Sequence, residues 1–132
     1  LLDAIDVFPQ ARLIDIGCGC GSVALSVAMR EPSAEVLAID SNARAIDCVR
    51  RGIELNQLSN LQVMLNHDGD IGRENAFDMA LANPPYFADF RIAQHFLDIA
   101  LKVLRPGGRL VLVTKQPNWY REHMPSTFDE VE

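Results

Sequence analysis

The sequence predicts an α/β fold built on a doubly wound, mostly parallel sheet with helices on both faces. Short apolar runs alternate with segments of helical periodicity along the 132 residues, and parallel strands joined by helical crossovers produce this order. Two polar motifs each follow directly on an apolar run, as expected for residues at the carboxyl ends of strands. With 48% hydrophobic residues, we expect one domain, residues 1–132, with a core of its own.

Five apolar runs are the predicted strands, and most are bounded by glycine, proline or polar residues. A sixth run, residues 128–131, is expected to begin another strand. Because the sequence starts without methionine and stops inside this run, we expect it to be a fragment of a longer chain. The five strands are predicted over residues 12–16, 35–39, 61–65, 77–82 and 109–114.

The predicted helices lie between these strands. Residues 22–30 are apolar on several sides and predict a buried helix, whereas residues 66–75 predict a polar loop. Ser41 is the expected N-cap of the second helix, and the Arg-Pro-Gly-Gly run at 105–108 is expected to end the third. Residues 119–123 predict a short helical turn. The apolar stripes are Ala43, Ile46, Val49 and Ile53 in the second helix and Ile92, Phe96, Ile99 and Val103 in the third.

The first motif is Asp15-Ile16-Gly17-Cys18-Gly19-Cys20-Gly21, directly after the first predicted strand. Its glycines allow a sharp turn and expose backbone N–H groups. A dinucleotide fingerprint would need its third glycine at position 22, which is Ser22. Asp15 suits a cationic amino-acid group and is a poor neighbour for pyrophosphate. Asp40, after the second strand, is placed to accept ribose hydroxyl protons, as in adenosylmethionine and nicotinamide sites alike. The motif therefore favours S-adenosylmethionine over a nicotinamide cofactor.

The second motif is Asn83-Pro84-Pro85-Tyr86, at the end of the fourth predicted strand. The Asn83 side-chain carbonyl and the Pro84 backbone carbonyl can accept the N–H bonds of a planar amine, and proline rigidity holds the second acceptor in place. Tyr86 can stack on a flat substrate. Methyl transfer to such an amine needs orientation and electrostatic fit, without a metal or a covalent enzyme intermediate. The four residues are therefore the predicted catalytic group, expected to face Gly17 across the switch point of the sheet.

These motifs resemble those of class I S-adenosylmethionine-dependent methyltransferases, over residues 13–131. The resemblance implies S-adenosyl-L-methionine as cofactor and S-adenosyl-L-homocysteine as product. It further implies that the sheet ends in an antiparallel hairpin, of which residues 128–131 would begin the first strand and the second would be missing. It also implies that Asp15 faces the methionine amino end, that Asp40 binds the ribose, and that Asp68, with Asp70 as the alternative, contacts the adenine. Asn42 is a weaker candidate for the same pocket. The expected cofactor-binding residues are Asp15, Gly17, Cys18, Gly19, Gly21, Asp40, Ser41, Asp68 and Asn83.

Within that superfamily, the second motif resembles those of enzymes that methylate amino nitrogens of adenine, guanine or glutamine. Residues 104–110 and 127–131 are similar to the "methyltransferase small" family, which includes the ribosomal RNA small-subunit methyltransferase C type. Guanine N2 of ribosomal RNA is the first acceptor that this implies. Tyr86 departs from many members of that group and is typical of enzymes acting on glutamine N5 or adenine N6, which remain alternatives. A non-catalytic cofactor-binding half-domain is the third hypothesis, disfavoured by the two intact motifs.

Composition limits the partners and the compartment. No apolar run is long enough to span a membrane, and three cysteines form no disulfide framework, so we expect a cytoplasmic protein with reduced thiols. The three histidines have no carboxylate or cysteine at metal-ligand spacing, and no metal is expected. A net charge of −6 is unusual for a nucleic-acid binder. An RNA acceptor would therefore need a local basic patch, for which the candidates are Arg91, Lys115, Arg121 and His123; the alternative is a solvated surface of mixed charge.

Overall fold

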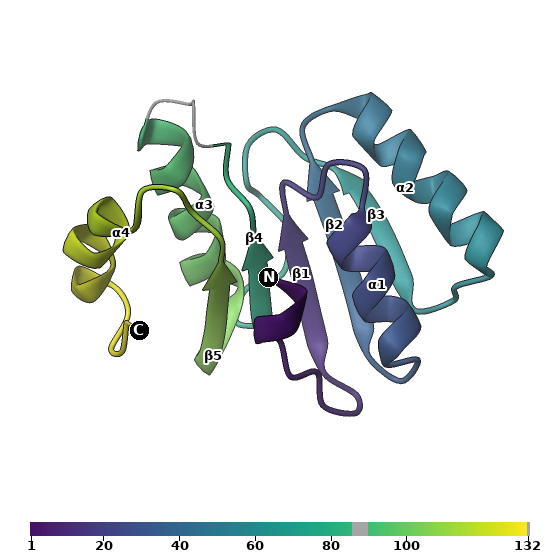
Figure 1. Ribbon diagram of the computed structural model, residues 1–132, viewed down its shortest axis with the longest axis horizontal. Helices are drawn as coiled ribbons and strands as arrows, with labels where there is room; N and C mark the ends of the chain where they lie inside the picture. Colours follow the sequence, from purple (N-terminus) through teal and green to yellow (C-terminus); the bar gives the residue numbers. More distant parts are fainter. Residues whose placement is uncertain (86–89, 132) are drawn as a thin grey trace.

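The computed structural model describes residues 1–85 and 90–131, and its centre is a five-stranded sheet in which every paired strand runs parallel. The strand order is β3-β2-β1-β4-β5, so the direction of winding reverses between β1 and β4 (Figure 1). This confirms the predicted doubly wound class. The strands are β1 (Arg12–Ile16), β2 (Glu35–Asp40), β3 (Leu61–Leu65), β4 (Phe77–Ala82) and β5 (Leu104–Leu112).

Helices cover both faces of this sheet (Figure 1). The α1 and α2 helices pack on one face and α3 packs on the other, while α4 lies beside α3 at the β5 edge. No helix in the described part of the chain is long and apolar enough to cross a membrane. The helices are α1 (Ser22–Arg30), α2 (Ala43–Asn56), α3 (Phe90–Val103) and α4 (Pro117–His123), with the 3₁₀ turns η1 (Leu2–Ala4) and η2 (Met124–Ser126).

The continuous apolar runs of the central strands follow from this double coverage. In β1, Leu13 packs with the core under α1 and α2, whereas Ile14 and Ile16 pack with the core under α3, and all three are fully buried. Strands buried on both faces lose the apolar–polar alternation of a one-sided sheet. The short apolar runs therefore mark the centre of the sheet correctly.

The predicted fifth strand differs from the observed one. The third helix ends at Val103 as expected, but β5 begins at once with Leu104 and ends at Leu112. Phe77 pairs with Leu104 and Met79 pairs with Arg109, so residues 105–108 form a bulge opposite Asp78. The Asp78 carboxylate accepts a hydrogen bond from the Arg12 backbone N–H at 2.7 Å and forms an ion pair with Arg105. A contact across the sheet thus keeps the Arg-Pro-Gly-Gly run within the strand.

The strand predicted over 128–131 is absent: these residues carry no strand pairing. The backbone N–H groups of Thr127 and Phe128 both donate to the Met124 carbonyl at 2.8 Å, which folds the chain back after α4. Phe128 and Val131 then pack against the small core between α3 and α4. Their apolar side chains therefore pack against helices α3 and α4 and do not extend the sheet.

Two helix starts also differ from expectation. Asn42, and not Ser41, is the N-cap of α2, because its side-chain oxygen accepts the Arg44 N–H at 3.0 Å. The α4 helix begins at Pro117, two residues before the predicted turn. Proline is well suited to the first turn of a helix because its missing N–H would have no partner there.

Candidate functional site

The glycine-rich turn begins where β1 ends, next to the end of β2. The Cys18 N–H donates to the Ile39 carbonyl at 2.9 Å, and the Gly21 N–H donates to the Cys18 carbonyl at 2.9 Å. Gly17, Gly19 and Gly21 all have positive φ, at +69°, +54° and +84°. L side chains rarely adopt this conformation, so the turn depends on its glycines.

The three glycines differ in the space around them. A Cβ on Gly17 would lie 2.6 Å from the ring of Phe96, and one on Gly21 would lie 2.6 Å from a methyl group of Val49. A Cβ on Gly19 would meet nothing within 4 Å. Two glycines therefore allow α3 and α2 to pack closely on the turn, whereas the space beside Gly19 is open.

Asp40 connects this turn to the second helix. Its Oδ2 accepts the Gly19 N–H at 2.9 Å, and its Oδ1 accepts the Asn42 N–H at 2.8 Å. An ionised carboxylate has about four acceptor positions, so acceptor capacity remains for two ribose hydroxyls. The structure thus places Asp40 at the turn as predicted and adds a role in holding Gly19.

Asp15 lies beneath the turn and is 3% exposed. Its Oδ2 accepts the Ala24 N–H at 3.2 Å in the first turn of α1. Burial raises the pKa of Asp15 to about 7; the Ala24 hydrogen bond opposes this shift, and the charge of Asp40 adds to it. The carboxyl is therefore poised between its two protonation states near neutral pH, and a cation brought close would favour the ionised form.

Cys18 serves the turn through its backbone. Its side chain is buried, and its N–H is already bonded to β2. Burial raises the pKa of the Cys18 thiol to about 12, with contributions from the charges of Asp15 and Asp40. The thiol stays protonated, so it is unsuited to act as a nucleophile.

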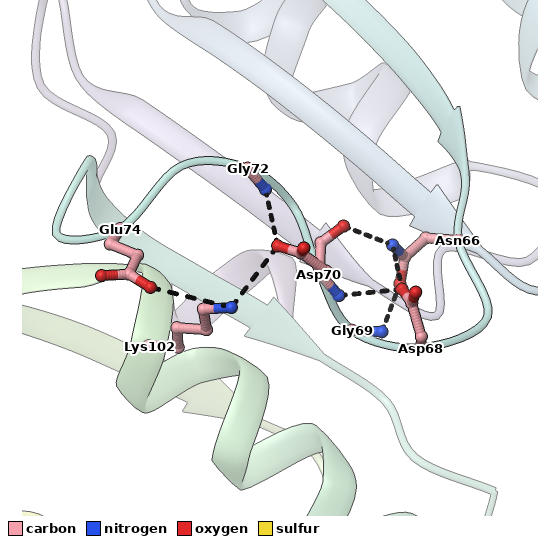
Figure 2. A network of polar contacts seen from close by, with 7 residues as sticks. All are labelled: Asn66, Asp68, Gly69, Asp70, Gly72, Glu74 and Lys102. Carbon is pink, nitrogen blue, oxygen red and sulfur yellow. Dashed lines mark hydrogen bonds and ion pairs between the residues drawn. The ribbon is translucent and has the colours of Figure 1, made fainter.

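The loop after β3 is organised by Asn66, a residue that the sequence reasoning did not single out. Its N–H donates to the Asp40 carbonyl at 2.9 Å. Its Oδ1 accepts the Gly69 N–H at 2.9 Å, and its Nδ2 donates to the Asp70 carbonyl at 2.9 Å (Figure 2). Gly69 has φ +79°, and a Cβ there would lie 2.9 Å from Ile99 of α3. The signal was an Asn directly after a predicted strand, since Asn side chains commonly bond to the backbone in turns.

Asp68 and Asp70 point to different partners within this loop. Asp68 Oδ1 accepts the Asp70 N–H at 3.0 Å and the Asn66 side-chain amide at 3.3 Å. Asp70 Oδ1 accepts the Gly72 N–H at 3.1 Å and pairs with Lys102 Nζ at 3.4 Å, and both contacts lower the pKa of Asp70 (Figure 2). Lys102 extends from α3, so Asp70 holds the loop against that helix. Asp68 is accordingly the better of the two adenine candidates.

The second motif lies at the neighbouring strand end. Ile16 of β1 pairs with Ala82 of β4, so Gly17 and Asn83 are the first residues past two adjacent strands. Asn83 is exposed, while Pro84 is buried and Pro85 is half-buried. The Asn83 side chain is therefore accessible at the surface, while the buried Pro84 next to it anchors the backbone. Tyr86 lies outside the described residues.

The predicted basic rim comes from three segments on the α3–α4 side. Arg91 is in the first turn of α3, Lys115 is in the connection between β5 and α4, and Arg121 and His123 are on α4. All four are exposed. Among the described residues, no three His, Cys, Asp or Glu side chains form a group that could hold a metal ion.

A hollow of about 480 Å³ lies at the opposite end of the sheet. Arg12, Glu35 and Phe77, at the starts of three strands, contribute to its lining, and it shares no residue with either motif. Ligands of doubly wound folds bind at the carboxyl ends of the strands. The chemistry of the two motifs therefore locates the candidate site better than the size of this hollow.

Comparisons with known proteins identify the family and the fold. The model of the family "Methyltransferase small domain" matches residues 1–132. Ribosomal RNA small subunit methyltransferase C of Hahella chejuensis is 33% identical over 94% of this chain and 38% of that protein. The rRNA N(6)-adenosine-methyltransferase metl-5 of Caenorhabditis elegans is 31% identical over 87% of this chain and 56% of that protein. The crystal structure of TrmN from Thermus thermophilus superposes with a TM-score of 0.79, at 29% identity, over 92% of this chain and 37% of that one.

Proposed function

Because this chain belongs to the methyltransferase small domain family, we propose that it is an S-adenosylmethionine-dependent N-methyltransferase domain acting on an exocyclic amino group of RNA. The observation that carries the proposal is the pairing of Ile16 with Ala82, which brings the glycine-rich turn and Asn83 to adjacent strand ends. A donor held over the turn then has its acceptor site at the second motif. Ribosomal RNA is the proposed substrate, and guanine N2 is the first choice of acceptor.

The turn and its neighbours fit this cofactor. Gly19 offers open backbone, and Asp40 retains acceptor capacity for ribose hydroxyls after bonding two N–H groups. The buried Asp15 carboxyl suits a cationic amino group, and Asp68 lies in the loop after β3, where the adenine is proposed to bind. S-adenosylmethionine supplies a methyl group made electrophilic by a sulfonium charge. The residues of this chain supply only position and electrostatic fit.

The second motif would hold the acceptor amine. An exocyclic amine is a weak nucleophile because its lone pair is delocalised into the ring. Asn83 Oδ1 and the Pro84 carbonyl can accept its two N–H bonds, which fixes the nitrogen and directs the lone pair toward the methyl group. The amine gains the charge that the sulfonium loses, and the extra proton leaves to water. No strong general base is required.

The relatives favour RNA over protein as the acceptor. Two of them are named as ribosomal RNA methyltransferases, one of them specific for N6 of adenosine. Adenine N6 is therefore the second choice, ahead of a protein glutamine. The proposed compartment is the cytoplasm, where ribosomal RNA is found.

The test uses the purified chain with methyl-labelled cofactor and ribosomal RNA. Digestion and mass spectrometry of the nucleosides should find N2-methylguanosine, and N6-methyladenosine would select the second choice. Asn83→Ala should lower the rate about a hundredfold, the usual scale for losing one positioned polar contact at a reacting centre. Asn56→Ala, on the exposed side of α2, is the matched control. A fully active Asn83→Ala variant would refute the proposed role of Asn83 in holding the amine.

A separate measurement addresses the non-catalytic hypothesis. Titration calorimetry with S-adenosylhomocysteine should show one site per chain, because both motifs that form it are intact. An Asp40→Ala variant should lose most of this affinity. Absence of binding by the unaltered chain would leave a structural half-domain as the better explanation.

A further inference from the structure

A group of stacked aromatic rings lies between the start of α3 and α4. Phe90 and Trp119 are stacked with their ring centroids 5.0 Å apart at 17°, and Trp119 and His123 are stacked at 4.3 Å and 16°. Tyr120 meets the edge of Trp119 at 5.0 Å and 87°. Trp119 therefore stacks on a ring of α3 and on a ring of its own helix, and we term these three residues the ring stack (Phe90, Trp119 and His123).

Packing accounts for only part of this group. Tyr120 is 6% exposed and forms a small core with Ala93, Leu97 and Met124. Phe90, in contrast, is 44% exposed, and His123 is exposed as well. A core between two helices needs Tyr120 but gains little from rings left in solvent. The ring stack thus offers flat aromatic surface beyond what holds α4 in place.

The ring stack lies next to the second motif along the chain. Phe90 is the first residue of α3 and follows Asn83 by seven positions. The α4 helix starts only five residues after β5 ends and lies alongside α3 (Figure 1). If the acceptor base binds at Asn83, the neighbouring nucleotides of the RNA would therefore be able to reach the ring stack.

Basic side chains lie close to the ring stack in the sequence. Lys115 is two residues before α4, and α4 carries Arg121 and His123 with one acid, Glu122. Arg121 lies between Tyr120 and His123 in sequence and is exposed, and Arg91 adjoins Phe90. Aromatic faces flanked by cations are typical of single-stranded RNA sites, where bases stack on rings and phosphates meet the positive charge.

We propose that the ring stack, together with Arg121, is a stacking platform for an unpaired RNA nucleotide next to the methylated one. This inference rests on the proposed function and adds to it how the acceptor strand is recognised. An unpaired base would stack on the exposed rings, and Arg121 would meet its phosphate. The platform would recognise single-stranded geometry rather than a particular base, because every base has an aromatic face.

The experiment exploits the fact that Trp119 is the only tryptophan of the chain. Unstructured oligoribonucleotides are titrated into the chain without cofactor, and tryptophan fluorescence is recorded. A base stacked on the rings should quench this signal with a single-site isotherm. Phe90→Ala should weaken binding about tenfold, or about 1.4 kcal/mol, and Phe90→Tyr should restore it. Arg121→Gln should reduce the salt dependence of binding by about one ion.

Matched controls lie away from the ring stack. Phe8 is 48% exposed and precedes β1 at the opposite end of the strands, so Phe8→Ala removes a comparable ring. Arg51 is exposed on α2, at the far edge of the molecule, so Arg51→Gln removes a comparable charge (Figure 1). Both variants should bind RNA like the unaltered chain. Circular dichroism of all variants establishes that they are folded.

The outcomes separate this inference from the proposed function. If RNA is methylated but Phe90→Ala binds RNA as Phe8→Ala does, the platform is refuted and the methyltransferase proposal stands. If RNA quenches Trp119 through the rings but no nucleoside is methylated, the platform stands and the proposed function fails. Quenching by a glutamine-containing acceptor peptide, with none by RNA, would overturn the platform as an RNA site.

Discussion

Gly17 of the glycine-rich turn lies directly against the ring of Phe96 in α3, with 2.6 Å between the ring and the position of a Cβ on Gly17. This contact joins the proposed cofactor turn to the helix that follows the Asn83 motif. Gly69 makes a similar approach to His95 and Ile99 on the same helix. The α3 helix therefore packs against both loops that are proposed to bind the cofactor. This close packing is possible because glycines at positions 17 and 69 have no side chain.

Gly17→Ala should destabilise the fold strongly. The substitution combines strain at φ +69° with a clash against Phe96, and each effect costs about 1 to 3 kcal/mol. Urea denaturation should therefore show a loss of about 2 to 5 kcal/mol in the free energy of unfolding. An unchanged midpoint would mean that α3 does not rest on the turn as described.

Gly19→Ala is the matched comparison, and it separates stability from cofactor binding. Its φ of +54° imposes the strain, but its Cβ would enter open space. We expect a loss of only about 1 kcal/mol in stability and a much larger loss of S-adenosylhomocysteine affinity, measured by calorimetry. If affinity survives this change, the cofactor does not pass over Gly19.

The ionisation of Asp15 should make the stability of the chain depend on pH. Its pKa is raised from 3.8 to about 7 in the folded state, so the folded chain binds this proton more tightly than the unfolded chain does. The contribution of Asp15 to stability is then complete below about pH 4 and is lost as pH rises to about 7. The loss amounts to at most about 4 kcal/mol. Asp15→Asn should abolish it, so the variant should gain stability relative to the unaltered chain between pH 5 and pH 8.

The same carboxyl should couple cofactor affinity to pH. A cationic amino group near Asp15 favours the ionised form, so affinity should rise between pH 6 and pH 8, by up to about tenfold for one proton released. Calorimetry with S-adenosylhomocysteine in buffers of different ionisation enthalpy would count that proton. In Asp15→Asn the dependence should be flat across this range, and a slope as steep as that of the unaltered chain would place the amino group elsewhere.

Asn60 should contribute more to stability than its half-exposed position suggests. Its side-chain amide lies within hydrogen-bond distance of three carbonyls, those of Ala28, Glu31 and Ala34, at 3.0 to 3.2 Å. These contacts join the end of α1 and the start of β2 to the residue before β3. Asn60→Ala should cost about 2 to 3 kcal/mol by thermal or urea denaturation.

Asn56→Ala is the control for that measurement. The Asn56 amide makes one contact, with the Gly52 carbonyl at 2.8 Å on exposed α2, and its loss should cost less than about 0.5 kcal/mol. Equal effects of the two substitutions would show that the three-carbonyl contact does not operate in solution.

Substitution of Asp68 should change cofactor affinity, whereas substitution of Asp70 should change thermal stability. Asp68→Ala should weaken S-adenosylhomocysteine binding about tenfold, because Asp68 is the proposed adenine contact. Asp70→Ala should leave affinity within about twofold but lower the melting temperature, because it removes one of the two carboxylate partners of Lys102 and the acceptor of the Gly72 N–H. The stability change should stay near 1 kcal/mol, since the ion pair is exposed. The reverse pattern would assign the adenine to Asp70.

Much of the fold could be predicted from the sequence alone. The positions of the first four strands followed from apolar runs, which are continuous in the central strands because these are buried on both faces. The turn at Gly17, Gly19 and Gly21 followed because only glycine reaches positive φ without strain. The proximity of this turn to Asn83 followed from topology, since β1 and β4 flank the point where winding reverses.

Other features depend on residues that are distant in sequence. The Arg-Pro-Gly-Gly run looked like a helix stop and became a bulge because Asp78, on the next strand, binds Arg105. Residues 128–131 had the pattern of a strand but pack under α4. Periodicity describes only near neighbours, so it cannot tell which of two apolar surfaces a short run will cover.

The sequence by itself determined the order of the elements, the glycine-rich turn and the class of chemistry, because each is a property of neighbouring residues and their allowed backbone conformations. Only the tertiary structure decided that Asp70 holds Lys102 while Asp68 does not, that Asp15 is buried enough to titrate near pH 7, and that Phe90 stacks on Trp119. These facts are set by burial and by contacts across the fold, which arise only when distant segments pack together.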